Sequence, residues 1–264
     1  MRASPYIAYG KKCFLNKSAY RFDNVISIVS TCMQFVVFWE IYKALYGGSG
    51  EIDGITMSMV TTNFILSMGL EAIFSPDDYF LPNKVWDGSI ATEFLRPISF
   101  KGRMIAENAG GALFNLIFRF IPALLLAVFT VGMLPPAGVD MLVLFILSAV
   151  LGFGVLWVIS FTVQMTVFWL MSIWSLITIK NALIKIFSGS MIPLWFMPEG
   201  VKRVLEFLPF SSIYFTPVQI YLGQLTYGEI ALKCGIQILW IVLIYLLGDF
   251  LWRKGQKKLI VQGG

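Results

Sequence analysis

Residues 140–169 read DMLVLFILSAVLGFGVLWVISFTVQMTVFW, and no charged residue follows Asp140 in this stretch. About 20 consecutive apolar residues in a helix suffice to cross the hydrocarbon core of a bilayer. The stretch is too long for a core strand or an ordinary core helix of a soluble domain. It therefore predicts a transmembrane helix, and its excess length indicates that the helix is tilted or projects beyond the bilayer.

The composition of the whole chain agrees with this prediction. Hydrophobic residues make up 58% of the 264 residues and charged residues 13%, and the mean hydropathy is +0.78. A soluble domain has about 25% charged residues. Further apolar stretches of spanning length occur at residues 24–46, 55–74, 106–134, 174–196 and 229–252. We predict a single all-α integral membrane domain over residues 1–264 with six transmembrane helices.

The basic residues predict the orientation of these helices. If the N-terminus is cytoplasmic, segments 1–23, 75–103 and 253–264 lie inside and the 197–228 loop lies outside. The inside segments then carry thirteen basic residues, namely Arg2, Lys11, Lys12, Lys17, Arg21, Lys84, Arg96, Lys101, Arg103, Arg253, Lys254, Lys257 and Lys258. The outside loop carries Lys202 and Arg203. Because basic residues favour the cytoplasmic side, we predict that both termini are cytoplasmic.

The net charge of +5 is therefore a signal of topology and of contact with lipid headgroups, and not of nucleic-acid binding.

The sequence contains no pattern for catalysis. Histidine is absent, which removes the commonest general base and metal ligand. No phosphate-binding G-x-x-x-x-G-K-[ST] motif and no G-x-S-x-G motif occur, and the three cysteines follow no disulfide or metal spacing. Asp77 and Asp78 form an adjacent carboxylate pair, but further aspartates for a magnesium site are missing. We predict that this chain holds no cofactor or metal, so energy for transport must come from a gradient or another polypeptide.

The 75–103 loop contains a short amphipathic helix. Trp86, Ile90 and Phe94 recur at the spacing of one helix face, Asp87 or Ser89 is suited to cap the helix start, and a proline ends it. Such a helix either rests on the bilayer surface or forms a docking surface for a soluble partner.

The 197–228 loop has a different pattern. Val201, Val204 and Leu205 keep helical spacing, and Pro209 breaks the helix before a second apolar stretch at 210–222. That second stretch is too short to span a bilayer as an independent helix. We predict a partly re-entrant extracellular hairpin. Non-helical backbone at that depth must be shielded by protein, which suggests packing against a second subunit.

Charged residues within the predicted spans are the candidate pathway residues, since such residues face a bundle interior or an aqueous cavity. They are Glu40, Lys43, Glu71, Arg119, Lys180 and Lys185. Matching depths predict ion pairs of Glu40 with Arg119 and of Glu71 with Lys180. Lys185 has no acidic residue at its predicted depth, so it ranks first as a residue that lines a cavity. Structural pairing and contact with a substrate both remain open for this set.

Three stretches resemble the membrane-spanning permease subunits of type-2 ATP-binding-cassette (ABC) exporters, in particular the bacterial branch of about this length. The first is 86–99, WDGSIATEFLRPIS. The second is 187–198, FSGSMIPLWFMP, followed by LPF at 208–210, Pro217 and Gly223. The third is the ending VQGG at 261–264.

The resemblance implies a half-transporter in the bacterial cell membrane. A second permease, identical or paralogous, completes the pathway, and a separate pair of cytoplasmic ATPases supplies ATP and Mg²⁺ chemistry. The ATPase would dock on a coupling helix formed by Trp86, Asp87, Gly88, Ile90, Phe94, Leu95, Arg96 and Pro97. Helix packing and the hairpin would depend on Gly189, Pro193, Pro198, Pro209 and Pro217. The cargo would be a hydrophobic or amphipathic drug, antibiotic, peptide or lipid, exported by alternating access.

The alternatives belong to other functional classes. A gradient-driven carrier or channel is expected to show inverted repeats or broken helices at matching positions, and no internal repeat is found in the sequence. An intramembrane enzyme would need Asp77 and Asp78 to bind a metal.

Overall fold

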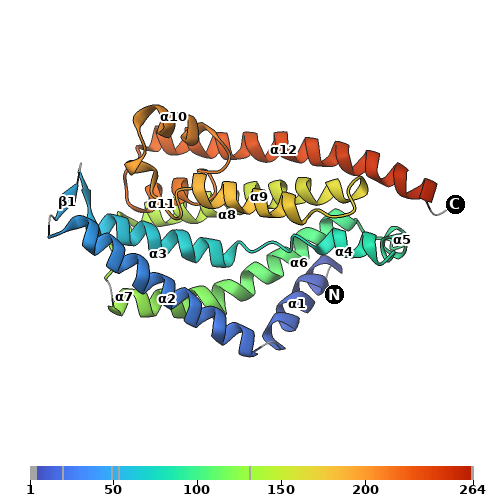
Figure 1. The fold of residues 1–264 in the computed structure, drawn as a ribbon, viewed down its shortest axis with the longest axis horizontal. Coiled ribbons are helices and arrows are strands. Elements are labelled where there is room, and N and C mark those ends of the chain that lie inside the picture. The colour runs from blue at the N-terminus through green and yellow to red at the C-terminus, as the bar shows by residue number, and fades with distance from the viewer. Residues whose placement is uncertain (1–4, 20, 49, 53, 131, 263–264) are drawn as a thin grey trace.

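The computed structural model describes residues 5–262 except 20, 49, 53 and 131, and its helices run mostly along one long axis (Figure 1). The described α-helices are α1 (Pro5–Ala19), α2 (Arg21–Tyr46), α3 (Met57–Ile73), α4 (Phe80–Trp86), α5 (Ile90–Phe94), α6 (Phe100–Asn115), α7 (Ile121–Thr130), α8 (Val139–Met165), α9 (Trp174–Phe187), α10 (Glu199–Phe207), α11 (Phe215–Tyr221) and α12 (Tyr227–Gln262). A two-stranded hairpin, β1 (Glu51–Ile52) with β2 (Ile55–Thr56), joins α2 to α3. Residues 1–4 and 263–264, including the end of the VQGG stretch, lie outside the described residues.

Four described helices are long and apolar enough to cross a membrane. They are Asn24–Tyr46, Phe100–Leu125, Val139–Phe168 and Tyr227–Lys258. Met57–Ile73 is a shorter apolar helix, and α9, in the fifth predicted span, has 14 residues and ends at Phe187. The fold is therefore that of an all-α membrane protein.

The predicted helical packing site at Ser188–Gly189–Ser190 lies instead in a turn. Gly189 has φ +76°, which favours glycine, and a Cβ there would lie 2.6 Å from a Leu194 methyl group. The turn ends α9 before the short 3₁₀ helix η3 (Leu194–Phe196). The helix of the fifth span is therefore shorter than the predicted 174–196.

The third span starts earlier than predicted and contains a wide turn. Ser99 caps α6, because its hydroxyl accepts from the Gly102 N–H at 3.3 Å, so the helix starts at Phe100 and not near 106. Between α6 and α7 lies the π-helical turn η1 (Leu116–Phe120), where the Ile121 N–H reaches back to Leu116. Pro122 follows directly and cannot donate to the helix ladder, which accounts for the local widening.

An N-terminal helix packs along most of α6. The sequence predicted only a cytoplasmic segment at 1–23, but α1 lies along α6 (Figure 1). The two backbones meet at glycines: a Cβ on Gly110 would lie 2.1 Å from the Gly10 carbonyl oxygen. Two facing glycines permit this close approach.

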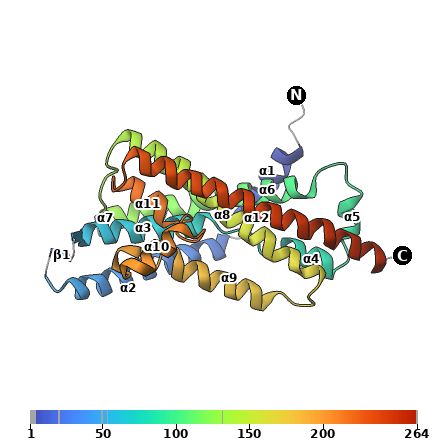
Figure 2. The same cartoon turned by 90° about the horizontal axis from the view of Figure 1, so that it is seen from above.

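The longest helix, α12, packs along α8 (Figures 1 and 2). Gln237 on α12 donates to the carbonyl oxygens of Ser148, at 3.0 Å, and Ser212, at 2.8 Å. The helix continues ten residues past Trp252, where the sequence predicted a tail. Lys, Arg and Gln in this stretch are good helix formers, and Gly255 packs closely on the Phe168 ring.

The 197–228 segment forms two helices, as its pattern predicted. Pro198 precedes α10, and Pro209 follows Leu208, the residue that caps the C-terminal end of α10. All seven residues of α11, including Pro217 in its first turn, are buried, and α11 packs against α8 and α3. This chain therefore supplies the shielding that we expected from a second subunit. Pro193 precedes η3.

Different elements lie at the two ends of the long axis of the molecule. Helices α4 and α5 and the C-terminus lie at one end, whereas the β1–β2 hairpin, α10 and α11 lie toward the other (Figure 1).

Candidate functional site

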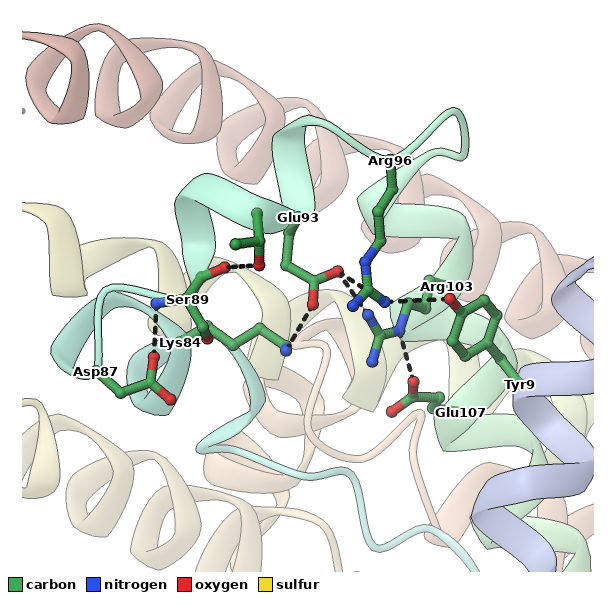
Figure 3. A network of polar contacts seen from close by, with 9 residues as sticks. Tyr9, Lys84, Asp87, Ser89, Glu93, Arg96, Arg103 and Glu107 are labelled. Atoms are coloured by element: carbon green, nitrogen blue, oxygen red, sulfur yellow. Dashed lines mark hydrogen bonds and ion pairs between the residues drawn. The ribbon is translucent and has the colours of Figure 1, made fainter.

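The predicted coupling helix is two short helices at the end of the molecule that also holds the C-terminus. Helix α4 ends at Trp86, a turn follows, and α5 begins at Ile90. Gly88 has φ +74°, and the Asp87 carboxylate accepts from the Ser89 N–H at 2.8 Å (Figure 3). Asp87 and Gly88 together form a tight turn, so the single helix predicted from Trp86 to Pro97 is wrong.

The turn divides the predicted apolar stripe. Ile90 is only 3% exposed and packs in a core with Phe80 and Leu81, whereas Leu95 is 85% exposed. Trp86 and Phe94 are also exposed, and Arg96 and Pro97 continue the exposed surface. The element therefore has an anchored inner face and an outward apolar patch formed by Trp86, Phe94 and Leu95.

Glu93 is the centre of an ion-pair network beneath this patch (Figure 3). Its side chain is 4% exposed, and its carboxylate lies 2.8 Å from the Lys84 Nζ, 2.5 Å from Arg103 and 3.7 Å from Arg96. Burial raises the pKa of Glu93, but hydrogen bonds from Lys84 and Arg103 outweigh burial and hold the pKa below its ordinary value. Glu93 is therefore ionised at neutral pH and joins α4, α5 and α6.

The network continues to α1 and α6. Arg103 lies 2.7 Å from Glu107, and its guanidinium carbon lies 4.5 Å from the centre of the Tyr9 ring. Arg96 donates to the Tyr9 hydroxyl at 3.1 Å (Figure 3). Helix α1 thus helps to hold the predicted coupling residues in place.

The inner side of the element is attached to α12. The Trp252 ring stacks on Phe100 at 5.2 Å and meets Phe94 edge-on at 5.8 Å, as measured between ring centres. Lys101 pairs with Asp249, which also lies 2.8 Å from Arg253. A displacement of α5 would therefore act directly on α12.

Polar side chains also hold the segment between α3 and α4. Gln164 on α8 donates to the Asp77 carbonyl oxygen and accepts from the Leu81 N–H, both at 3.1 Å. Asn108 on α6 accepts from the Asp77 N–H at 3.0 Å. Lys180 on α9 lies 2.6 Å from the Asp78 carboxylate and 3.0 Å from the Ser160 hydroxyl.

The Lys180 contacts correct one predicted ion pair. Lys180 is buried and pairs with Asp78, in the segment between α3 and α4, rather than with Glu71. Asp78 is therefore engaged by a lysine. Among the described residues, no group of three or more Cys, Asp or Glu side chains could hold a metal ion.

A polar groove of about 480 Å³ lies at the α2, α3 and η1 helices, and Glu71 and Arg119 both line it. Its other lining residues are Ile26, Ser27, Ser30, Thr31, Gln34, Met68, Ala72 and Ser75. The polar residues at 27, 30, 31 and 34 share one face of α2. A polar face on an apolar spanning helix is expected to face protein or an aqueous cavity.

The predicted ion pair between Glu40 and Arg119 is wrong. Glu40 lies 4.0 Å from Lys43, and both side chains are exposed. Arg119 donates to Asn24 at 3.2 Å, and Asn24 and Glu40 are about 24 Å apart along α2 at 1.5 Å per residue. The estimated depth of Arg119 in the membrane was wrong because the third span begins at Phe100, and its first turns lie beside α1 rather than beside α2.

Lys185 has an acidic neighbour that the sequence did not indicate. It is exposed on α9, and its charge acts on the Glu71 carboxylate of α3. Lys185, Glu71 and the groove therefore belong to one region, whereas Lys180 belongs to the support of the coupling element.

Comparison with known families assigns the chain that contains the α4–α5 element and the groove to a family. The sequence model described as ABC-2 family transporter protein matches residues 26–263. The chain belongs to this family. It is thus a permease component of an ABC transporter, a membrane protein whose family implies association with an ABC ATPase, and the gradient-driven alternative is set aside. No curated protein matches the chain.

Several residues that organise the ABC-2 permease were not singled out from the sequence. Glu93 lay within the predicted coupling helix, and its position between two basic residues, Lys84 and Arg96, could have indicated an ion pair. Gln164 was an amide within an apolar span, which by itself indicates a buried polar contact. Tyr9 carried no signal, since its role depends on how α1 packs.

Replacing Lys180 with methionine is expected to destabilise the permease. Methionine keeps the length of the side chain, but it leaves the Asp78 carboxylate, 14% exposed, without its cation. Removing one partner of a buried ion pair costs about 3 kcal/mol or more. The apparent melting temperature in detergent measures the effect. Lys43→Met, at an exposed ion pair, is the control and should melt like the wild type; an equal shift in both variants would contradict a buried structural pair.

Proposed function

We propose that this permease exports a hydrophobic or amphipathic compound, with ATP and Mg²⁺ bound by a separate pair of cytoplasmic ATPase chains. The observation that carries the proposal is the outward patch of Trp86, Phe94 and Leu95 on an element that is anchored to α12 by Trp252. Apolar side chains that lie outside a folded core mark interaction sites. The patch is the surface on which the ATPase docks.

The supports of the patch provide a route for force. Glu93 joins the element to α6, and Trp252 joins it to α12. Gln164 and Lys180 join the preceding segment to α8 and α9. A force on α5 is therefore transmitted to α6, α8, α9 and α12 together. Alternating access requires such a joint movement of the helices of the subunit.

The groove beside Glu71 and Arg119 is the proposed cargo path. It offers both signs of charge and several hydroxyl groups next to apolar walls. These features suit an amphipathic molecule with a polar or zwitterionic head, such as a drug, antibiotic, peptide or lipid. A second permease chain, identical or paralogous, would complete the path.

The proposed setting is the bacterial cell membrane with both termini in the cytoplasm. The basic residues of the terminal segments and of the 75–103 loop support this orientation, since the positive-inside bias sets topology. The coupling element then faces the compartment that contains ATP.

Replacing Lys185 with alanine is expected to lower ATP-driven export while complex assembly is unchanged. Lys185 is not a lining residue of the groove, but its charge acts on Glu71, which is. Loss of one charge that attracts a cargo lowers the capture of that cargo about tenfold. The complex with its ATPase, in proteoliposomes, is first screened with lipids, peptides and drugs for ATPase stimulation, and uptake of the stimulating compound is then measured. Lys43→Ala, a membrane-helix lysine outside the groove, serves as the control. Wild-type transport by Lys185→Ala would remove the groove from the path.

A further inference from the structure

A second hollow, outside the coupling element and the groove, lies between α1 and α6. It measures about 290 Å³ and is lined by Tyr9, Lys12, Cys13, Asn16, Lys17, Arg103 and Glu107. Helix α1 packs closely on α6 through Gly10 and Gly110, and the Arg103 guanidinium of α6 lies over the Tyr9 ring. The hollow therefore lies between two helices that are in close contact.

The charges in this hollow do not balance. Its one carboxylate, Glu107, is engaged by Arg103 at 2.7 Å. Among the described side chains, no carboxylate lies within ion-pair distance of the Lys12 or Lys17 ammonium. Lys17 is half-buried, and its ammonium lies over Gly111, 3.0 Å from where a Cβ would be. Burial lowers the pKa of Lys17, as expected for an ammonium that has lost water and has no ion-pair partner among the described side chains.

The position of the hollow indicates the source of the anion. The Lys17 carbonyl oxygen accepts from the Asn24 side chain at 3.0 Å, and Asn24 is the first residue of a candidate membrane span. The two lysines therefore lie at the level where the hydrocarbon core ends and lipid phosphates begin. Leu15, which lies between the two lysines in the sequence, is an exposed apolar side chain of α1 and is suited to contact acyl chains.

We propose that the hollow between α1 and α6 binds the headgroup phosphate of an anionic phospholipid, held by Lys12 and Lys17. The Tyr9 hydroxyl and the Asn16 amide offer polar atoms for the rest of the headgroup. Basic pockets beside membrane helices bind anionic headgroups in this way. Because Tyr9 and Arg103 also belong to the network around Glu93, the bound lipid stabilises the support of the coupling element.

The test uses the full-length permease in an uncharged detergent, with phosphatidylglycerol or phosphatidylcholine added, and native mass spectrometry counts bound lipid. The wild type should retain phosphatidylglycerol over phosphatidylcholine. Lys12→Gln and Lys17→Gln should each lower retention roughly fivefold, and the double variant about thirtyfold. Lys11→Gln is the matched control, since Lys11 is an exposed lysine of α1 that does not line the hollow.

Two results would overturn the proposal. The first is equal retention of both lipids by the wild type, or no loss in the double variant. The second is displacement of phosphatidylglycerol by millimolar inorganic phosphate, which would assign the hollow to a free anion. The readout needs neither cargo nor ATPase, so it is independent of the proposed export function.

Discussion

The double variant Phe94→Asp, Leu95→Asp is expected to lose copurification with the partner ATPase. Leu95 is 85% exposed and Phe94 is partly exposed at the end of α5, so both can enter a pocket on a partner. Burying two carboxylates in an apolar interface without cations is strongly unfavourable, and loss of two central apolar anchors costs about 2 kcal/mol each. Together these changes lower the affinity by at least about a thousandfold.

The control for this variant is Val139→Asp. Val139 is 81% exposed at the first turn of α8, where an acidic side chain is tolerated by the helix dipole. Val139→Asp should melt like the wild type in detergent, and the double variant should stay folded with a slightly lower melting temperature, because Phe94 gives up its ring contact with Trp252. Undiminished ATPase binding by the double variant would show that the partner docks elsewhere and that the patch rests on the bilayer.

The sequence predicted the membrane helices better than their ends. Long apolar stretches carry their own signal, because the bilayer selects for length and hydropathy. The ends depend on local chemistry: Ser99 moves the start of the third span, and Gly189 ends α9 early. Helix α1 was missed since its stability comes from α6, through Gly10 and Gly110, and a single sequence does not show that contact.

The predicted coupling helix differs in shape from the two short helices of the structure. Trp86, Ile90 and Phe94 have helical spacing, yet Asp87 and Gly88 are also strong turn formers. The structure has the turn instead of a continuous helix, and Ile90 is buried while Trp86 and Phe94 are exposed. Periodicity alone could not distinguish these arrangements.

The predicted ion pairs failed for a general reason. Depth along a span gives one coordinate, whereas pairing also requires two helices to face each other. Lys180 pairs with Asp78 in the segment between α3 and α4, and Arg119 in η1 donates to Asn24 near the start of α2. Glu71 and Arg119 both line the groove, where their predicted pathway roles can be tested.

The variant Glu93→Gln is expected to produce the largest loss of stability in the coupling element. Glutamine keeps the shape of the side chain but leaves Lys84 and Arg103 without the charge that they share at 2.8 Å and 2.5 Å. Removing one partner from a buried ion-pair network costs about 3 kcal/mol, which lowers the melting temperature by roughly 6–12 °C. Glu40→Gln, at an exposed pair with Lys43, should change it little.

The pH dependence separates lost charge from lost packing. Since the pKa of Glu93 is held below its ordinary value of 4.5 in the folded protein, its ion pairs stabilise the fold above that value, and their contribution is lost as the pH falls through the lowered pKa. The difference in melting temperature between the wild type and Glu93→Gln should therefore be full at pH 7 and shrink in acid. A difference that stays constant down to acid pH would assign the effect to packing, and the role of Glu93 as the charged centre that joins α4, α5 and α6 would be wrong.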